Sequence, residues 1–194
     1  MIGIEEIKEE LKTILSSKRY EHSLGAMEKA IELAEVFGED KEKVAYTALV
    51  HDIAKEMSIE EMLDYALKNG IELTKEDKLI TRTLHGIIGA DIVKKKYGFT
   101  QEMQGAIYYH TTGRENMTLL DKIVFLADKS EKGREGEDAE KLRNVIETEG
   151  LDKAILWDID YYTIPRMINK QKMIHPNSIY ARNDLIRITK ENEI

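Results

Sequence analysis

Apolar residues recur at helical spacing along nearly the whole chain. Ile4, Ile7, Leu11 and Ile14 lie three or four residues apart, which is the period of one face of an α-helix. The same pattern predicts further helices near residues 20–37, from 41, from 59, 87–97, 101–109, 151–169 and 177–189. We therefore expect an all-α protein.

Short polar signals mark where these helices begin and end. Ser58 with Glu61 is a capping box, and Thr74 and Thr118 are followed by aspartates at the same spacing. Pro165 is expected to kink the helix over 151–169, and the charged stretch 129–138 to form a loop. No linker, low-complexity tract or repeat is evident, so residues 1–194 are expected to form one domain.

Composition limits the classes of function. A chain of 194 residues with 42% hydrophobic residues can bury a real core. The lack of cysteine excludes disulfides and thiolate zinc sites. No apolar run approaches the roughly 20 residues of a membrane span, so a cytoplasmic protein without membrane partners is expected. The formal charge of −8 argues against a nucleic-acid polymer as partner, but not against a small phosphorylated ligand.

Four of the five histidines stand at predicted helix ends or junctions, namely His22, His51, His85 and His110. A lone histidine is usually a surface or core residue without a special role. Four in similar contexts, several beside small residues, suggest convergence on one pocket.

The doublet His51-Asp52 ends an apolar segment, and imidazole with carboxylate suits iron, manganese or zinc. Successive helical residues point about 100° apart, so both can reach a metal only beyond the helix end. A salt bridge from Asp52 to a lysine, with His51 exposed, explains the doublet equally well. Asp128 ends another apolar helix and is the better second acid, because Asp121 is explained as a helix-start residue.

The order His22, His51-Asp52, His85, His110, Asp128 resembles the HD-domain metal-dependent phosphohydrolases, whose signature is H…HD…D. The blocks "RYEHSLG", "ALVHDIAKE", "LHGIIGA", "HTTG" and "FLADKSEKGR", within residues 19–134, resemble the YqeK branch in sequence and order. "MIHPNS" resembles its C-terminal block. Lys132 departs from the proline that the branch commonly has before the Gly-Arg pair.

This resemblance implies a compact HD-domain helical bundle with a metal, iron in family members, held by His22, His51, Asp52 and Asp128. It implies symmetrical cleavage of dinucleoside tetraphosphates, such as diadenosine tetraphosphate to two ADP, and a homodimer. It also implies that helices within 151–190 pack on the HD core and close a nucleoside pocket. By resemblance, the nucleoside is contacted by Met173, Ile174, His175, Pro176, Asn177 and Ser178, although a simple turn explains His175 as well.

Further roles follow from position relative to the metal. Asp52 and Lys55 are expected to be catalytic, and phosphate is expected to contact Lys55, Arg19, Arg134, Thr111 and Thr112. An ordinary surface position is the alternative for the lysine and arginines. His85 and His110 are expected to be catalytic and substrate-binding residues, which either hold a second metal or contact phosphate and protonate the leaving group.

Three other functions remain open from the sequence. The first is another HD-domain nucleotide phosphohydrolase, such as a nucleoside monophosphate phosphatase. The second is a nucleotide-binding regulatory module without turnover. The third is a helical interaction protein with incidental histidines.

Overall fold

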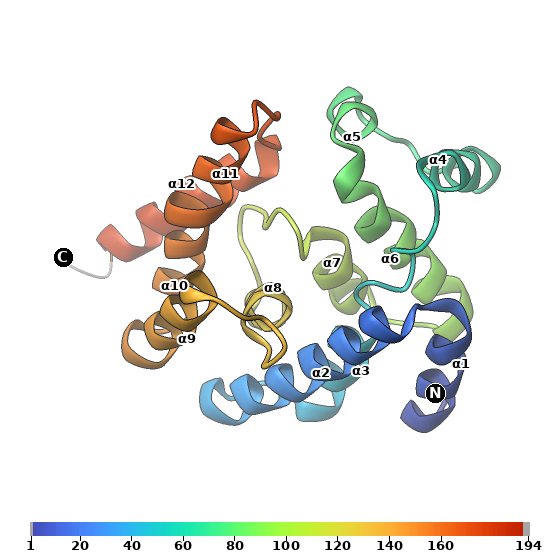
Figure 1. Ribbon diagram of the computed structural model, residues 1–194, viewed down its shortest axis with the longest axis horizontal. Helices are drawn as coiled ribbons and strands as arrows, with labels where there is room; N and C mark the ends of the chain where they lie inside the picture. Colours follow the sequence, from blue (N-terminus) through green and yellow to red (C-terminus); the bar gives the residue numbers. More distant parts are fainter. Residues whose placement is uncertain (1, 192–194) are drawn as a thin grey trace.

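The computed structural model describes residues 2–191, and every regular element in that range is helical (Figure 1). The expectation of an all-α fold is confirmed. The helices are α1 (Ile4–Ile14), α2 (Ser17–Phe37), α3 (Lys41–Leu49), α4 (Ile59–Lys68), α5 (Lys75–Leu79), α6 (Leu84–Tyr97), α7 (Gln101–Tyr109), α8 (Leu119–Ser130), α9 (Glu137–Glu149), α10 (Leu151–Trp157), α11 (Ile164–Asn169) and α12 (Pro176–Glu191), with a 3-10 turn η1 (Thr81–Thr83) and a π-helical segment η2 (Asp158–Thr163).

Helix α8 is the centre of the packing. It contacts α2, α3, α7, α9 and α10, and Figure 1 shows it end-on in the middle of the molecule. From Leu120 to Ala127, seven of the eight residues of α8 are buried, on every face of the helix, and Lys122 is the exception. A helix that is apolar all round must lie inside the protein, which explains its central position.

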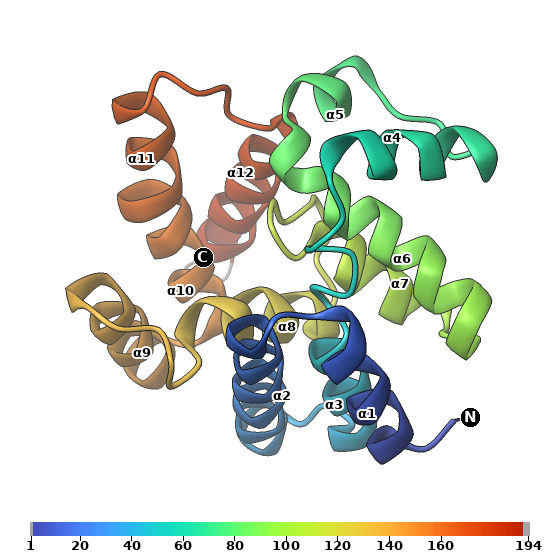
Figure 2. The same ribbon diagram turned by 45° about the vertical axis from the view of Figure 1, so that its right-hand side comes forward.

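The other helices flank α8 on two sides. Helix α10 packs on α8 and carries α12 with it, adding Ile155, Ile159, Ala181 and Leu185 to the main core. On the far side, α4 packs on α6 over a second, smaller core cluster. Figure 2 shows α11 and α12 on one side of the molecule and α4 to α6 on the other. None of the helices within residues 2–191 is long and apolar enough to cross a membrane.

The predicted helix starts agree with the structure. Ser58, Thr74 and Thr118 each accept a hydrogen bond from the backbone N–H three residues on, and the acid at that position caps back. Such reciprocal caps need only local sequence, which is why they were predictable. The helix expected from Tyr20 begins at Ser17, and the one expected from Ile87 begins at Leu84.

The loop predicted over 129–138 was too long. Helix α8 continues to Ser130 and α9 begins at Glu137, so only residues 131–136 connect them. The acids that open α9 favour a helix N-terminus because they face its positive dipole end. Because these acids follow other charged residues, the first turn of α9 could not be told from a loop in the sequence.

The stretch 151–169 is interrupted before Pro165 rather than at it. Pro165 stands in the first turn of α11, where a missing N–H costs nothing. The irregularity is instead η2, in which the backbone turn widens to take one extra residue.

Candidate metal centre

Five separate segments bring the predicted histidines and acids together. His22 comes from α2, His51 and Asp52 from the turn after α3, and Asp128 from α8. His85 lies in the first turn of α6 and His110 directly follows α7. Glycines in α6 permit this approach: a Cβ at Gly86 would lie 2.8 Å from the carbonyl of Tyr108. The close packing of α6 on α7 therefore places two of the histidines.

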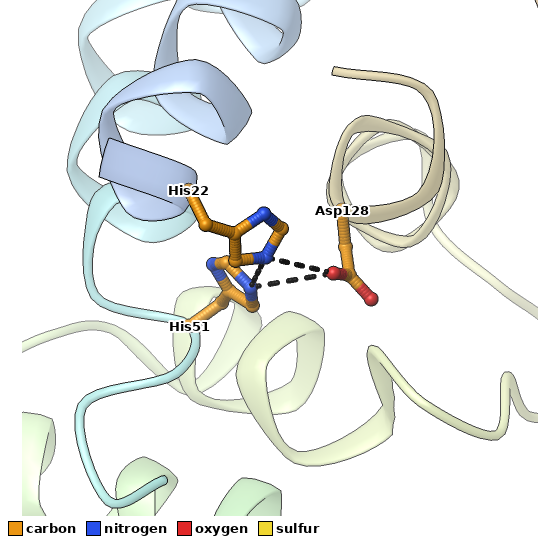
Figure 3. Close-up of side chains that lie close together, drawn as sticks. All are labelled: His22, His51 and Asp128. Carbon is orange, nitrogen blue, oxygen red and sulfur yellow. Dashed lines mark hydrogen bonds and ion pairs between the residues drawn. The ribbon is translucent and has the colours of Figure 1, made fainter. Parts of the chain in front are cut away.

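His22, His51 and Asp128 form the first group of the cluster (Figure 3). Asp128 Oδ1 lies 3.0 Å from His22 Nε2 and 3.6 Å from His51 Nε2. The two Nε2 atoms are 3.3 Å apart. One carboxylate oxygen and two imidazole nitrogens thus converge on a space of the size that one ion fills.

Asp52 joins this group to a second one. Its Oδ2 lies 3.8 Å from His51 Nε2, and its Oδ1 lies 3.2 Å from His85 Nε2 and 3.5 Å from His110 Nε2. Asp52, His51 and His110 also meet the spacing of a metal-binding set. Lys55 Nζ, 2.9 Å from His85 Nε2 and 3.3 Å from Asp52 Oδ1, closes this side.

The outer ring nitrogens determine which imidazole nitrogen faces inward. His51 Nδ1 and His110 Nδ1 each lie 2.7 Å from a backbone carbonyl oxygen, of Ala48 and Ile107. A carbonyl only accepts, so each Nδ1 carries the hydrogen and each Nε2 presents a lone pair. His22 has the same arrangement, because its Nδ1 donates to Oε1 of Glu131 at 3.1 Å.

Inward lone pairs at these separations repel unless a cation lies among them. Asp52 Oδ1 adds to this, because it is buried and makes no hydrogen bond within residues 2–191, although the Lys55 ammonium forms an ion pair with it at 3.3 Å. An oriented imidazole with a carboxylate or carbonyl behind it is the usual second shell of a metal ligand. The donor set of imidazole nitrogens and carboxylate oxygens therefore fits a divalent metal ion.

The charges of the cluster follow from burial and proximity. Burial lowers the pKa of His110 to about 4 and also lowers that of His85. Burial alone would raise the pKa of Asp52 and Asp128, but the neighbouring imidazoles and lysines hold both well below the ordinary value. Burial would also lower the pKa of His51, but Asp52 and Asp128 raise it overall. Two ionised carboxylates thus lie beside the imidazoles of His85 and His110, for which burial favours the neutral form that metal ligation needs.

Two arginines predicted from sequence lie at the edge of the cluster. Arg19 places a terminal guanidinium nitrogen 3.3 Å from Asp52 Oδ2. Arg134 donates to Asp128 Oδ1 at 2.7 Å and through Nε to the Asp128 carbonyl at 2.8 Å. Arg143 of α9 in turn donates to the carbonyls of Ser130 and Glu131 at 2.9 Å, which fixes the loop that carries Arg134.

Glu131 and Lys129 were missed by the sequence reasoning. The Glu131 carboxylate is buried, supports His22 and accepts from the N–H of Gly133. Gly25 of α2 makes room for it, since a Cβ there would lie 2.5 Å from Glu131 Oε2. Lys129 donates to the His110 carbonyl at 3.1 Å. Both looked like members of a charged loop, and nothing in their local sequence signals these long-range contacts.

The threonines and the C-terminal block lie differently from one another. Thr111, next to His110, has a buried hydroxyl without a hydrogen-bond partner within residues 2–191, whereas Thr112 donates to the Gly113 carbonyl at 2.8 Å.

The block 173–178 is not part of the cluster. His175 is buried, 3.3 Å from Asp77 Oδ1, and accepts from the Asn177 N–H at 3.2 Å. Met173 is exposed.

Two pockets meet at Arg134. One, of about 740 Å3, is lined by Arg19, His22, Glu131 and Arg134 among others. The second, of about 420 Å3, includes Asp128, Lys129 and Arg134 and extends to α10, η2 and α11. The cluster is thus approached from two sides.

Comparison with known proteins agrees with this site. The HD domain family model matches residues 19–133, which include every histidine and acid of the cluster. The chain belongs to the HD domain family.

Two relatives carry the name symmetrical bis(5'-nucleosyl)-tetraphosphatase. The protein of Halalkalibacterium halodurans is 36% identical over 91% of this chain and 93% of its own length. The protein of Staphylococcus aureus is 35% identical over 94% of each. A solved structure from Clostridium acetobutylicum, described as a predicted HD superfamily hydrolase involved in NAD metabolism, superposes with a TM-score of 0.92 at 40% identity, over 96% of this chain and 98% of that one.

Proposed function

We propose that this chain is a metal-dependent hydrolase that cleaves dinucleoside tetraphosphates symmetrically, diadenosine tetraphosphate and water giving two ADP. The observation that carries the proposal is the convergence of four imidazole Nε2 atoms and two carboxylates, with cationic side chains directly beside them. The names of the relatives support the substrate. Two pockets open from the cluster on different sides, so a long polyphosphate substrate could extend from it in more than one direction.

The metal in this proposal is iron or another divalent transition metal. His22, His51, Asp52 and Asp128 would hold it, and His85 and His110 would hold a second ion if there are two, with Asp52 between them. When bound, such an ion polarises a phosphoryl oxygen and makes water a better nucleophile. The distances between the ligand atoms suit one ion or two.

The chain's own residues would position the polyphosphate and neutralise its charge. Burial lowers the pKa of Lys55 although Asp52 opposes this, and its ammonium would contact a phosphate beside Asp52. Arg19 and Arg134 would each direct a planar fork at phosphate oxygens. The Thr111 hydroxyl, which has no hydrogen-bond partner within residues 2–191, would donate to a further phosphate oxygen. If His85 and His110 hold no metal, they would contact phosphate and protonate the leaving group.

The test combines metal analysis with product analysis. The wild type is expected to retain a divalent transition metal and to convert diadenosine tetraphosphate to ADP only. Asp52→Ala and Asp128→Ala are expected to lose metal and at least a hundredfold in rate. Asp64→Ala, an exposed aspartate paired with Lys68, is the control. Full metal content and rate in both site variants would contradict the proposal.

The products also separate the alternatives. AMP with ATP would exclude symmetrical cleavage, and turnover of nucleoside monophosphates alone would favour a monophosphatase. Tight nucleotide binding without turnover would favour a regulatory module. The nucleoside contacts of residues 173–178, the single domain, the homodimer, the lack of a nucleic-acid partner and the cytoplasmic location stay predictions.

A further inference from the structure

The smaller pocket has two chemically different halves. Asp128, Lys129 and Arg134 line the half next to the metal centre, and Trp157 and Asp158 lie in the other half. Three acids at or just before the start of α9, Glu135, Glu137 and Asp138, also line the pocket. Its volume of about 420 Å3 falls within the range of small-ligand sites. The cations Lys129 and Arg134 suit phosphate, whereas the second half has a different chemistry.

Asp158 is a buried acid that the proposed chemistry does not use. Its residue is 1% exposed, and its carboxyl accepts a hydrogen bond from the Thr163 hydroxyl at 2.9 Å. Within residues 2–191, no cation forms an ion pair with it. Burial, with the nearby charge of Asp128, raises the pKa of Asp158 against the opposing effect of Lys129. An acid buried without a cation is costly, and such groups gather at functional sites.

The π-helical segment holds this carboxyl in place. Asp158 begins η2 and Thr163 ends it. A π-helical turn joins residues five apart, which is the separation of these two side chains. The widened turn therefore orients Asp158, and such insertions are often found at functional sites.

Aromatic side chains stand beside the acid. Trp157, the residue before Asp158, is half-buried, and Tyr162 lines the same pocket. Arg166 lies over the Tyr162 ring, with its guanidinium carbon 5.3 Å from the ring centroid. Flat π-faces are the surfaces on which nucleobases stack. A planar base with polar edges matches this half better than a second phosphate, which an unpaired acid would repel.

We propose that this pocket binds one nucleoside of the substrate, with the Asp158 carboxyl hydrogen-bonded to the edge of the base and Trp157 and Tyr162 against its faces. The assignment rests on the proposed function, because it takes the charged half as the phosphate site. It makes Asp158 the residue that recognises the base. A pocket that hydrogen-bonds a base edge discriminates against bases lacking that donor.

The test measures ADP and pyrophosphate binding to the metal-loaded protein by calorimetry. Asp158→Ala is expected to weaken ADP binding about tenfold and to leave pyrophosphate binding unchanged. Asp158→Asn retains the shape and the contact with Thr163 but turns an amino group toward the base, so it is expected to act in the same direction. If the alanine variant does not fold, the binding of ADP and pyrophosphate is compared between wild type and Asp158→Asn alone.

Two further measurements separate base recognition from a structural effect. Wild type is expected to prefer ADP to purine riboside 5'-diphosphate, which lacks the 6-amino group, and the Asp158 variants are expected to lose this preference. Asp160→Ala, in the same segment but paired with Arg182, should keep it. Turnover of diadenosine tetraphosphate should show a raised KM with kcat within about twofold, since the lost contact is remote from the reacting phosphates.

The outcomes distinguish the two proposals. If wild type does not cleave diadenosine tetraphosphate, the proposed function fails. If it does, but the Asp158 variants keep ADP affinity or weaken pyrophosphate binding equally, the assignment of the base site is wrong.

Discussion

His22 is oriented by Glu131, whose Oε1 lies 3.1 Å from the Nδ1 of the imidazole. This pair joins α2 to the loop after α8 and determines that Nε2 of His22 faces Asp128. The carboxylate is buried and also accepts from the Gly133 N–H. It has the position and bonding of a group that tunes a metal ligand without touching the metal.

Glu131→Gln is therefore expected to weaken metal binding. The amide has one acceptor oxygen instead of two, so it cannot serve both His22 and Gly133. Loss of such a partner typically costs ten- to a hundredfold in metal affinity. Titration of the metal-free protein measures this directly. Glu28→Gln, an exposed glutamate paired with Lys132, should bind metal as wild type does, and equal affinity in the two variants would contradict the role.

Gly25→Ala is expected to reach the same carboxylate from the other side. The new Cβ would lie 2.5 Å from Glu131 Oε2, and the flexible end of the glutamate can move away. Stability should hardly fall, because alanine favours a helix over glycine by about 1 kcal/mol. Metal affinity should nonetheless drop. Gly3→Ala, where nothing lies within 4 Å, is the control for the same titration and unfolding curves.

Arg19→Lys should affect substrate binding more than folding. The Arg19 guanidinium spans Asp52 Oδ2 at 3.3 Å and Glu56 Oε1 at 3.9 Å. A single ammonium cannot keep both and still face a phosphate. We expect KM for diadenosine tetraphosphate to rise about tenfold, as for one charge-assisted hydrogen bond. Arg182→Lys, in the pair with Asp160, should leave KM unchanged, and so would Arg19→Lys if Arg19 were only a surface residue.

Gly113→Ala is expected to destabilise the protein more than Gly98→Ala. Both glycines have positive φ, 68° and 67°, so alanine strains the backbone by roughly 1 kcal/mol at each. Only at Gly113 would the Cβ also approach another residue, lying 2.9 Å from the Cβ of Ala181 on α12. Overpacking adds about 1–3 kcal/mol there. If chemical denaturation shows the same loss of unfolding free energy in both variants, α12 moves away from the new methyl group without cost and the prediction is wrong.

Asp184 makes stability depend on pH. Burial would raise the pKa of Asp184, but Arg187 at 2.7 Å and the Asn116 N–H at 2.8 Å lower it overall. Its contribution is then complete above the unfolded pKa, about 3.9, and is lost as the pH falls through the lower folded value. Asp184→Asn should cost about 1–2 kcal/mol at pH 7. The difference from wild type should shrink below pH 4, as unfolding at a series of pH values would measure.

Local signals were readable from the sequence, and long-range ones were not. The caps at Ser58, Thr74 and Thr118 depend on residues three apart, so the sequence contained them whole. The same rule also favoured Asp128 over Asp121 as the second acid of the metal site, and Asp121 indeed caps α8. Glu131 could not be found in this way. Its partner His22 is 109 residues distant, and its own surroundings read as a charged loop.

Side-chain orientation was equally hidden. The helix-end positions of the histidines suggested a shared pocket, but which nitrogen of His51 or His110 faces inward depends on carbonyls three residues earlier. The π-helical segment was also beyond reach, because its pattern of apolar residues differs little from that of an α-helix with a proline.

The one extra residue in η2 has an evolutionary consequence. Each residue of an α-helix turns the chain by about 100°, so deletion of a single codon within 158–163 would return the segment to regular helix and rotate Asp158 relative to Arg166. Helix α11 has no fully buried residue, so it could follow this rotation without disturbing the core. Under the proposed role of Asp158, a length change in this segment would alter base preference while the catalytic centre stays the same.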